Sequence, residues 1–105
     1  MKLEIVTPEK MVFSHDAELV TLPGVEGEFG VLANHAPLIA ELQAGEINVY
    51  DKAEGGMPKA KFKLTGGGFA QVTEKSCSVL SDSCEEITNS YSASKGNVTD
   101  IKKKK

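Results

Sequence analysis

Short runs of alternating apolar and polar residues fill most of the chain. Leu3 and Ile5 alternate with Glu4 and Val6 at the N-terminus. Successive side chains of a strand point to opposite faces, so a period of two places one apolar row against a core. Patterns of this kind predict strands at residues 3–6, 11–13 with 17–22, 37–42, 46–51, 59–65, 69–73 and 76–81.

Turn signals between these runs predict how the strands connect. Residues 7–10 contain Pro8 and suit a type I turn. A kink or bulge is expected at residues 14–16, within the returning strand. Residues 37–42 and 46–51 are predicted to pair, and the glycines at 66–68 to close a hairpin in a three-strand meander. Short strands at this spacing predict an all-β domain over residues 1–88, a sandwich or a barrel.

The chain changes character after Asp82. We expect a short final strand near residues 84–88, followed by a mobile polar tail over 89–105 that ends in four lysines. The alternative is a short helix that begins in a capping box at residues 83–86 and stops at Gly96. Many poor helix formers between residues 88 and 94 favour the strand.

The charge distribution narrows the range of partners. The chain has 105 residues and a net charge of −3, and all twelve basic residues are lysines. Without the terminal Lys102, Lys103, Lys104 and Lys105, the remaining eight lysines face 15 carboxylates, a net charge of −7. An acidic body argues against nucleic-acid binding. Because arginine is absent, the chain supplies no arginine finger and no bidentate phosphate clamp.

Membrane and redox signals are weak. No stretch of 18 uncharged residues is present, and the N-terminus lacks the pattern of a secretory signal. Two cysteines without an export signal fit a reducing cytoplasm. Any membrane association is therefore expected to come through partners.

Residues 24–30 hold three glycines at a spacing of three, directly after Pro23. Glycine adopts positive φ angles that other residues avoid, so this stretch predicts a tightly folded loop. The loop carries Glu26 and Glu28 and leads into the uncharged segment 31–40. An acidic loop beside an apolar surface indicates docking more than chemistry.

Candidate catalytic and ligand-binding groups do not form a recognised pattern. Ser14, His15 and Asp16 are adjacent, so in a strand they alternate between faces and make no triad. The cysteines and histidines are too scattered for the paired ligands of a structural zinc site, and Cys77 is expected to be a small core residue. The glycines at 66–68 precede a strand, whereas a phosphate loop precedes a helix. We predict no catalytic, metal, nucleotide or cofactor site.

Residues 22–32 and the following His-Ala-Pro-Leu at 35–38 closely resemble the signature of one family, the epsilon subunit of bacterial F-type ATP synthases (delta in mitochondria). The resemblance extends from residues 3–9 to 77–82, about four fifths of the chain. One departure is Ala33 and Asn34, where the family often has Pro-Gly or Pro-Asn. Losing that proline removes a fixed φ angle and bears on the stiffness of the loop.

The resemblance implies a flattened β-sandwich of about ten strands and a non-catalytic rotor subunit. Such a subunit binds the gamma subunit and the c-ring, reaches the alpha and beta subunits indirectly, and lies at the cytoplasmic face of the bacterial plasma membrane. The implied loop facing the c-ring comprises Gly24, Glu26, Gly27, Glu28, Phe29 and Gly30. The implied gamma face comprises His35, Ala36, Pro37, Leu38 and Ala40.

Two alternatives stay open at this point. His35 is either a turn histidine that bonds local backbone or a contact residue on the docking face. The whole domain is either the rotor subunit or a free-standing β-sandwich module that binds a ligand or peptide. Family members typically continue into a C-terminal hairpin of two helices, which the last 20 or so residues here cannot build. The inhibition and ATP binding found in that hairpin are therefore not expected.

Overall fold

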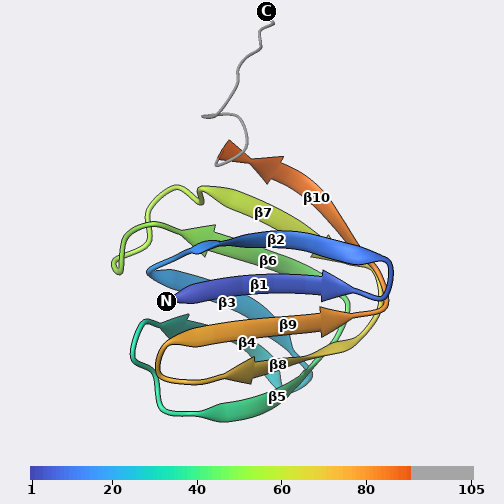
Figure 1. The fold of residues 1–105 in the computed structure, drawn as a ribbon, viewed down its shortest axis with the longest axis horizontal. Helices are drawn as coiled ribbons and strands as arrows, with labels where there is room; N and C mark the ends of the chain where they lie inside the picture. Colours follow the sequence, from blue (N-terminus) through green and yellow to red (C-terminus); the bar gives the residue numbers. More distant parts are fainter. Residues whose placement is uncertain (91–105) are drawn as a thin grey trace, which may run out of the picture.

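The computed structural model describes residues 1–90, which form ten strands (Figure 1). The strands are β1 Lys2–Thr7, β2 Lys10–Asp16, β3 Leu19–Gly24, β4 Gly27–Leu32, β5 Leu38–Leu42, β6 Gly45–Tyr50, β7 Ala60–Leu64, β8 Gly68–Val72, β9 Ser76–Ser81 and β10 Cys84–Asn89. The predicted all-β class is therefore confirmed, as is the turn between β1 and β2.

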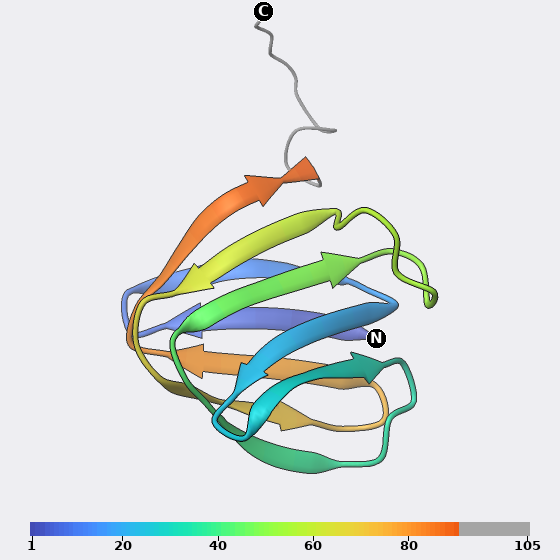
Figure 2. The same ribbon diagram turned by 180° about the vertical axis from the view of Figure 1, so that it is seen from behind.

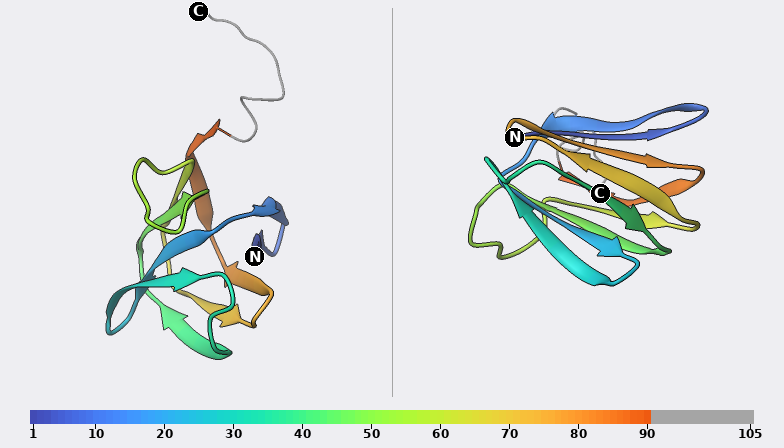
Figure 3. Two further views of the ribbon diagram at one scale, coloured as in Figure 1. Left: turned by 90° about the vertical axis from the view of Figure 1, so that its left-hand side faces the viewer. Right: turned by 90° about the horizontal axis from the view of Figure 1, so that it is seen from below.

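The strands build two layers of a sandwich (Figures 2 and 3). One layer has the order β10-β7-β6-β3-β4 and the other β5-β8-β9-β1-β2. Strand β3 connects them, because it pairs with β6 and then meets β5 where Gly24 lies opposite Leu42. All pairings are antiparallel except that of β1 with β9. A continuous ladder thus holds both layers in one body.

The core lies between the layers and follows the alternation seen in the sequence. In β7 every second side chain is buried, and its lysines point outward. The rings of Phe13 and Phe62 meet edge to face with centroids 5.0 Å apart, and this contact joins β2 to β7 across the sandwich. The buried apolar side chains are Leu3, Ile5, Phe13, Ala17, Val20, Leu22, Val31, Leu42, Ile47, Val49, Ala60, Phe62, Leu64, Ala70, Val72, Cys77 and Val79.

The predicted interruption at residues 14–16 is wrong. Strand β2 runs unbroken to Asp16, and β3 is a separate strand. The irregularity lies earlier, where Ile5 faces Phe13 but Val6 faces Met11, which leaves Val12 as the extra residue. A bulge adds one residue to one strand of a pair and shifts the register of the pairing beyond it. Polarity at residues 14–16 was the wrong signal, because an edge strand tolerates polar side chains.

Two predicted pairings are also wrong. Strands β5 and β6 do not pair, since β5 pairs with β8 and β6 with β7. Nor do β7 and β8 form a hairpin: residues 66–68 carry the chain from one layer to the other. Glycines are needed here because the link passes close to other backbone. A Cβ on Gly68 would collide with the carbonyl oxygen of Leu80, and a Cβ on Gly67 would lie 3.1 Å from the carbonyl oxygen of Leu42. The β8–β9 hairpin is as predicted.

The predicted final strand is confirmed as β10, which pairs with β7. The alternative helix is wrong for residues 84–89. The predicted domain boundary after residue 88 falls just before the end of β10, and from residue 91 the predicted tail lies outside the described residues.

Candidate functional site

The acidic segment at residues 24–30 is a hairpin tip, and the predicted loop is wrong over most of its length. Strands β3 and β4 pair from Leu19 opposite Leu32 to Gly24 opposite Gly27, so only two residues form the turn. Gly27 has φ 129°, a conformation that side-chain-bearing residues rarely adopt. The turn residues and both glutamates of this segment are exposed. The three-glycine spacing therefore predicted tightness correctly but missed that strands carry it.

The hairpin tip is held down by buried residues at its base. Pro23 and Gly24 are buried, and the backbone N–H of Val25 donates to the carbonyl of Glu41 over 3.0 Å. The N–H of Gln43 likewise donates to the carbonyl of Pro23 over 2.9 Å. These bonds fix the tip against β5 and define where its exposed carboxylates stand.

The His35 segment is a turn that leads into β5. Asn34 takes φ 68°, as its short polar side chain permits. The backbone N–H of His35 donates to the carbonyl of Leu32 over 3.1 Å, and its Nδ1 lies 2.7 Å from the carbonyl oxygen of Ala36. His35 thus bonds local backbone, as one of its two interpretations predicts. A partner contact through this residue stays a prediction.

Strand β5 divides its side chains between the interior and solvent. Leu38 and Ala40 are half-buried and share the inward side with Leu42, whereas Ile39 and Glu41 are exposed. Ile39, which neither predicted set contains, is 73% exposed. The alternation of a strand could have identified it, because every second position must face the other way. Ala36 and Pro37, before the strand, are exposed as well.

The two predicted site segments meet at one groove, here called the seam groove. It is lined by residues 24–27, Phe29 and residues 38–41, and its volume is about 450 Å³. The structure therefore brings together part of the predicted c-ring loop and part of the predicted gamma face. Glu28 and Gly30, and residues 35–37, are not among the residues that line it.

A second surface, missed at the sequence level, lies on the outer face of the β5-β8-β9-β1-β2 layer. Cross-strand register places Met11, Val6, Leu80 and Phe69 in one row over four adjacent strands. We call these four residues the apolar row. A second groove of about 480 Å³ runs beside three of them. Only part of the signal was local: alternation in β8 turns Phe69 away from Ala70 and Val72, but it does not show which residues lie beside Phe69.

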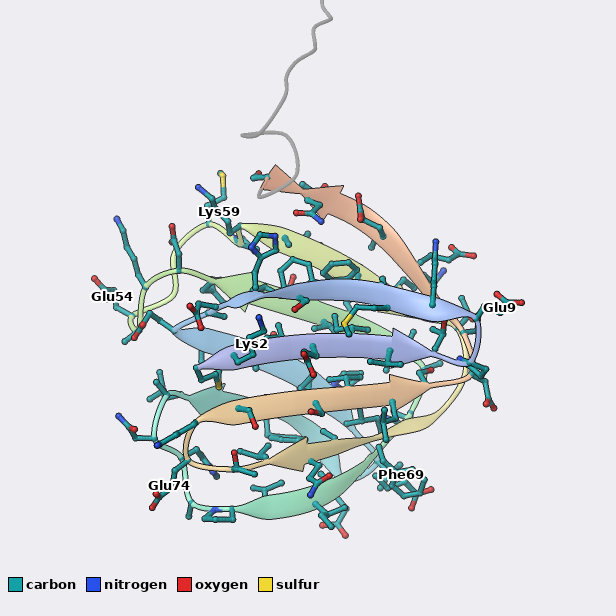
Figure 4. The ribbon with its side chains drawn as sticks, viewed as in Figure 1. Lys2, Glu9, Glu54, Lys59, Phe69 and Glu74 are labelled. Carbon is teal, nitrogen blue, oxygen red and sulfur yellow. The ribbon has the colours of Figure 1, made fainter. Side chains whose placement is uncertain are left out.

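The apolar row and the seam groove adjoin each other. Glu41, which lines the seam groove, lies directly opposite Phe69 in the β5–β8 ladder. In Figure 4 Phe69 stands at the end of the molecule opposite Glu54 and Glu74. The apolar row and the acidic side of the seam groove thus form one continuous surface.

Titratable groups elsewhere do not converge. Ser14 and His15 point to opposite faces of β2, since their ladder partners are the half-buried Glu4 and the buried Leu3. Among residues 1–90 no three His, Cys, Asp or Glu side chains are grouped so that they could hold a metal ion. Burial raises the pKa of the Cys77 thiol to about 11. Burial, and secondarily the charge of Glu85, raises the pKa of Cys84.

Within the described part of the chain, no helix is long and apolar enough to cross a membrane. The geometry defines a class: a compact β-sandwich that leaves an apolar row and an acidic hairpin tip uncovered. The sequence model of one family, described as the ATP synthase delta/epsilon chain β-sandwich domain, matches residues 1–87. The chain belongs to this family.

Curated relatives agree with this assignment. The ATP synthase epsilon chain of Rhodospirillum rubrum is 38% identical over 88 residues, which are 84% of this chain and 63% of the relative. That of Desulfatibacillum aliphaticivorans is 47% identical over 83 residues, 79% of this chain and 56% of the relative. The chain therefore matches less than two thirds of the length of these relatives.

Solved structures show the same fold. A chain of the Euglena gracilis mitochondrial ATP synthase, in a structure of OSCP, F1 and the c-ring, gives a TM-score of 0.69 at 23% identity, covering 80% of this chain and 51% of that chain. A chain of the Tetrahymena thermophila mitochondrial ATP synthase central stalk and c-ring gives 0.63 at 14% identity, covering 79% and 63%.

Proposed function

We propose that this domain is a non-catalytic rotor subunit of a proton-translocating F-type ATP synthase. It couples rotation of the c-ring to the gamma subunit and so to ATP synthesis by the alpha and beta subunits. The observation that carries the proposal is that one stiff body presents two adjoining contact surfaces, the apolar row and the acidic hairpin tip. A closely packed sandwich core deforms little, which suits a part that transmits torque.

The gamma subunit is the proposed partner of the apolar row. Phe69 is 54% exposed, Met11 52% and Leu80 50%, although they stand side by side on a regular sheet. A contiguous apolar patch on a soluble domain marks a protein contact. The proposed gamma face extends along β5 to His35, Ala36 and Pro37, which are at least partly accessible.

The c-ring is the proposed partner of the hairpin tip. Glu26 and Glu28 are exposed there, and Gly27 keeps the tip narrow enough to approach another backbone closely. The β3–β4 ladder, which runs from Leu19 to Gly24 on β3, holds the tip in a fixed position relative to the sandwich. With these contacts the domain would sit at the cytoplasmic face of the bacterial plasma membrane, attached through the complex.

Co-purification from native membranes tests the proposal. Tagged protein should retain the gamma, alpha and beta subunits and the c-ring through gentle detergent extraction. Membranes from cells lacking this chain should lose most ATP-driven proton pumping, and adding the purified protein should restore it. A free-standing ligand-binding module would purify alone and leave pumping unchanged, and that result would overturn the proposal.

A further inference from the structure

The seam groove lies between two consecutive strands that do not pair with each other. Within residues 1–90, β4 pairs with β3 alone, and β5 pairs with β8 and meets β3 only at its C-terminal end, where Gly24 faces Leu42 and the N–H of Val25 donates to the carbonyl of Glu41. Beyond that junction no ladder joins β4 to β5, so each strand has an edge segment without a strand partner within residues 1–90. Such edges are the places where an extended segment of another chain adds to a sheet.

The groove has an apolar floor and apolar sides. Phe29 and Leu38 are partly buried against the core and close its base. Val25, in the turn between β3 and β4, is 45% exposed, and Ile39, on β5, is 73% exposed. The two side chains line the groove from these two segments. This arrangement offers contact to an aliphatic side chain from a partner.

The charge of the groove has one sign. Glu26 from the hairpin tip and Glu41 from β5 line it, and no lysine does. The ion pair found within the described residues, Lys59 with Asp51, belongs to a different part of the molecule. Two carboxylates at an apolar groove attract a cationic side chain and repel an anionic one.

We propose that the seam groove binds a short extended segment of a rotor partner in which a lysine or arginine stands beside an aliphatic residue. Glu41 receives the cationic side chain and sets the specificity of this contact, while Ile39 packs on the aliphatic one. This inference rests on the proposed function and adds Glu41 and Ile39 to it. Neither residue belongs to the contact sets expected from the sequence.

The experiment measures rebinding of purified protein to its own ATP synthase after removal of this subunit. Glu41→Lys should weaken rebinding about tenfold at low ionic strength, and Glu41→Gln less. The difference from wild type should shrink at about 0.5 M salt, because exposed charges are then screened. Glu54→Lys makes the same charge change at the opposite end of the molecule (Figure 4) and should bind as wild type does.

Ile39→Ser gives a second arm that does not depend on charge. The side chain is largely exposed, so its loss should leave thermal unfolding unchanged while rebinding weakens about tenfold at every salt concentration. Thermal unfolding of all four variants verifies folding. Equal rebinding of Glu41→Lys and Glu54→Lys, or unchanged rebinding of Ile39→Ser, would overturn the inference while leaving the rotor role intact. If wild-type protein itself fails to rebind, both the inference and the proposed function fall.

Discussion

Gly24 and Phe29 lie so close across the β3–β4 hairpin that no side chain fits between them. A Cβ on Gly24 would stand 2.9 Å from Cε1 of Phe29 and 2.8 Å from the carbonyl oxygen of Gly27. The glycine is therefore needed for space. Positive φ is found instead at Gly27, on the other strand of the same pair. The two glycines that face each other at the hairpin tip are therefore required for different reasons: Gly24 for lack of space and Gly27 for its backbone conformation.

Replacing Gly24 by alanine should thus destabilise the domain through overpacking. We expect Gly24→Ala to lower the free energy of unfolding by about 1–3 kcal/mol, measured by urea denaturation. Gly66→Ala is the matched control, since a Cβ there meets no atom within 4 Å, and it should change stability little. Equal midpoints for the two variants would show that the ring and the tip move aside freely.

Replacing Gly27 by valine should act through the backbone alone. A Cβ at Gly27 meets nothing within 4 Å, but φ 129° is unfavourable for a β-branched residue and costs about 1–3 kcal/mol. The hairpin tip should respond by changing shape, so Gly27→Val should reduce ATP-driven proton pumping in the reconstituted enzyme. Gly66→Val serves as the control. Normal pumping by Gly27→Val would remove the tip from the coupling path.

The strands themselves could be predicted because one face of each is buried. In β7 the alternation of apolar and polar residues matches burial position by position, and in β9 it does so from Ser76 to Val79. Strand pairing could not be predicted in the same way. A glycine-rich link such as residues 66–68 fits a hairpin and a passage between layers equally well, and contacts distant in sequence, such as Gly68 against Leu80, decide between them.

The candidate surfaces were predictable only in part, for a related reason. Motif resemblance pointed to residues 35–38 and Ala40 but omitted Ile39, the most exposed apolar side chain of β5. Which side of a strand faces solvent depends on where the second layer lies. The apolar row depends on four strands placed side by side, and Met11 and Phe69 are 58 positions apart in the chain. No local pattern contains that information.

Lys63 provides a test of cross-strand charge pairing. It lies between Glu46 on β6 and Glu85 on β10, directly opposite each in the ladders. Lys63→Glu should put three carboxylates in one row and destabilise the domain by about 0.5–2 kcal/mol at low salt. Urea denaturation at low salt and in 1 M NaCl should show the loss shrinking as charges are screened.

Lys75→Glu, in the turn between β8 and β9, is the matched control for Lys63→Glu. It makes the same charge change outside the ladder and should cost less stability. If the two variants lose the same stability at low salt, net charge and not cross-strand pairing explains the effect.

Cys77 should make the stability of the domain depend on alkaline pH. Burial raises its pKa from 9.0 to about 11, so the unfolded thiol ionises first. The stabilising effect of keeping this thiol protonated is fully present below pH 9 and is lost as the pH rises toward 11. Wild-type protein should therefore lose about 2–3 kcal/mol more than Cys77→Ala over this interval. The measurement is urea denaturation at several pH values, with Cys84→Ser in both proteins to prevent oxidation. Lysine and tyrosine titration is common to both proteins and cancels in the difference. If the stability of both proteins falls equally with pH, burial does not raise the pKa of Cys77, and the prediction is wrong.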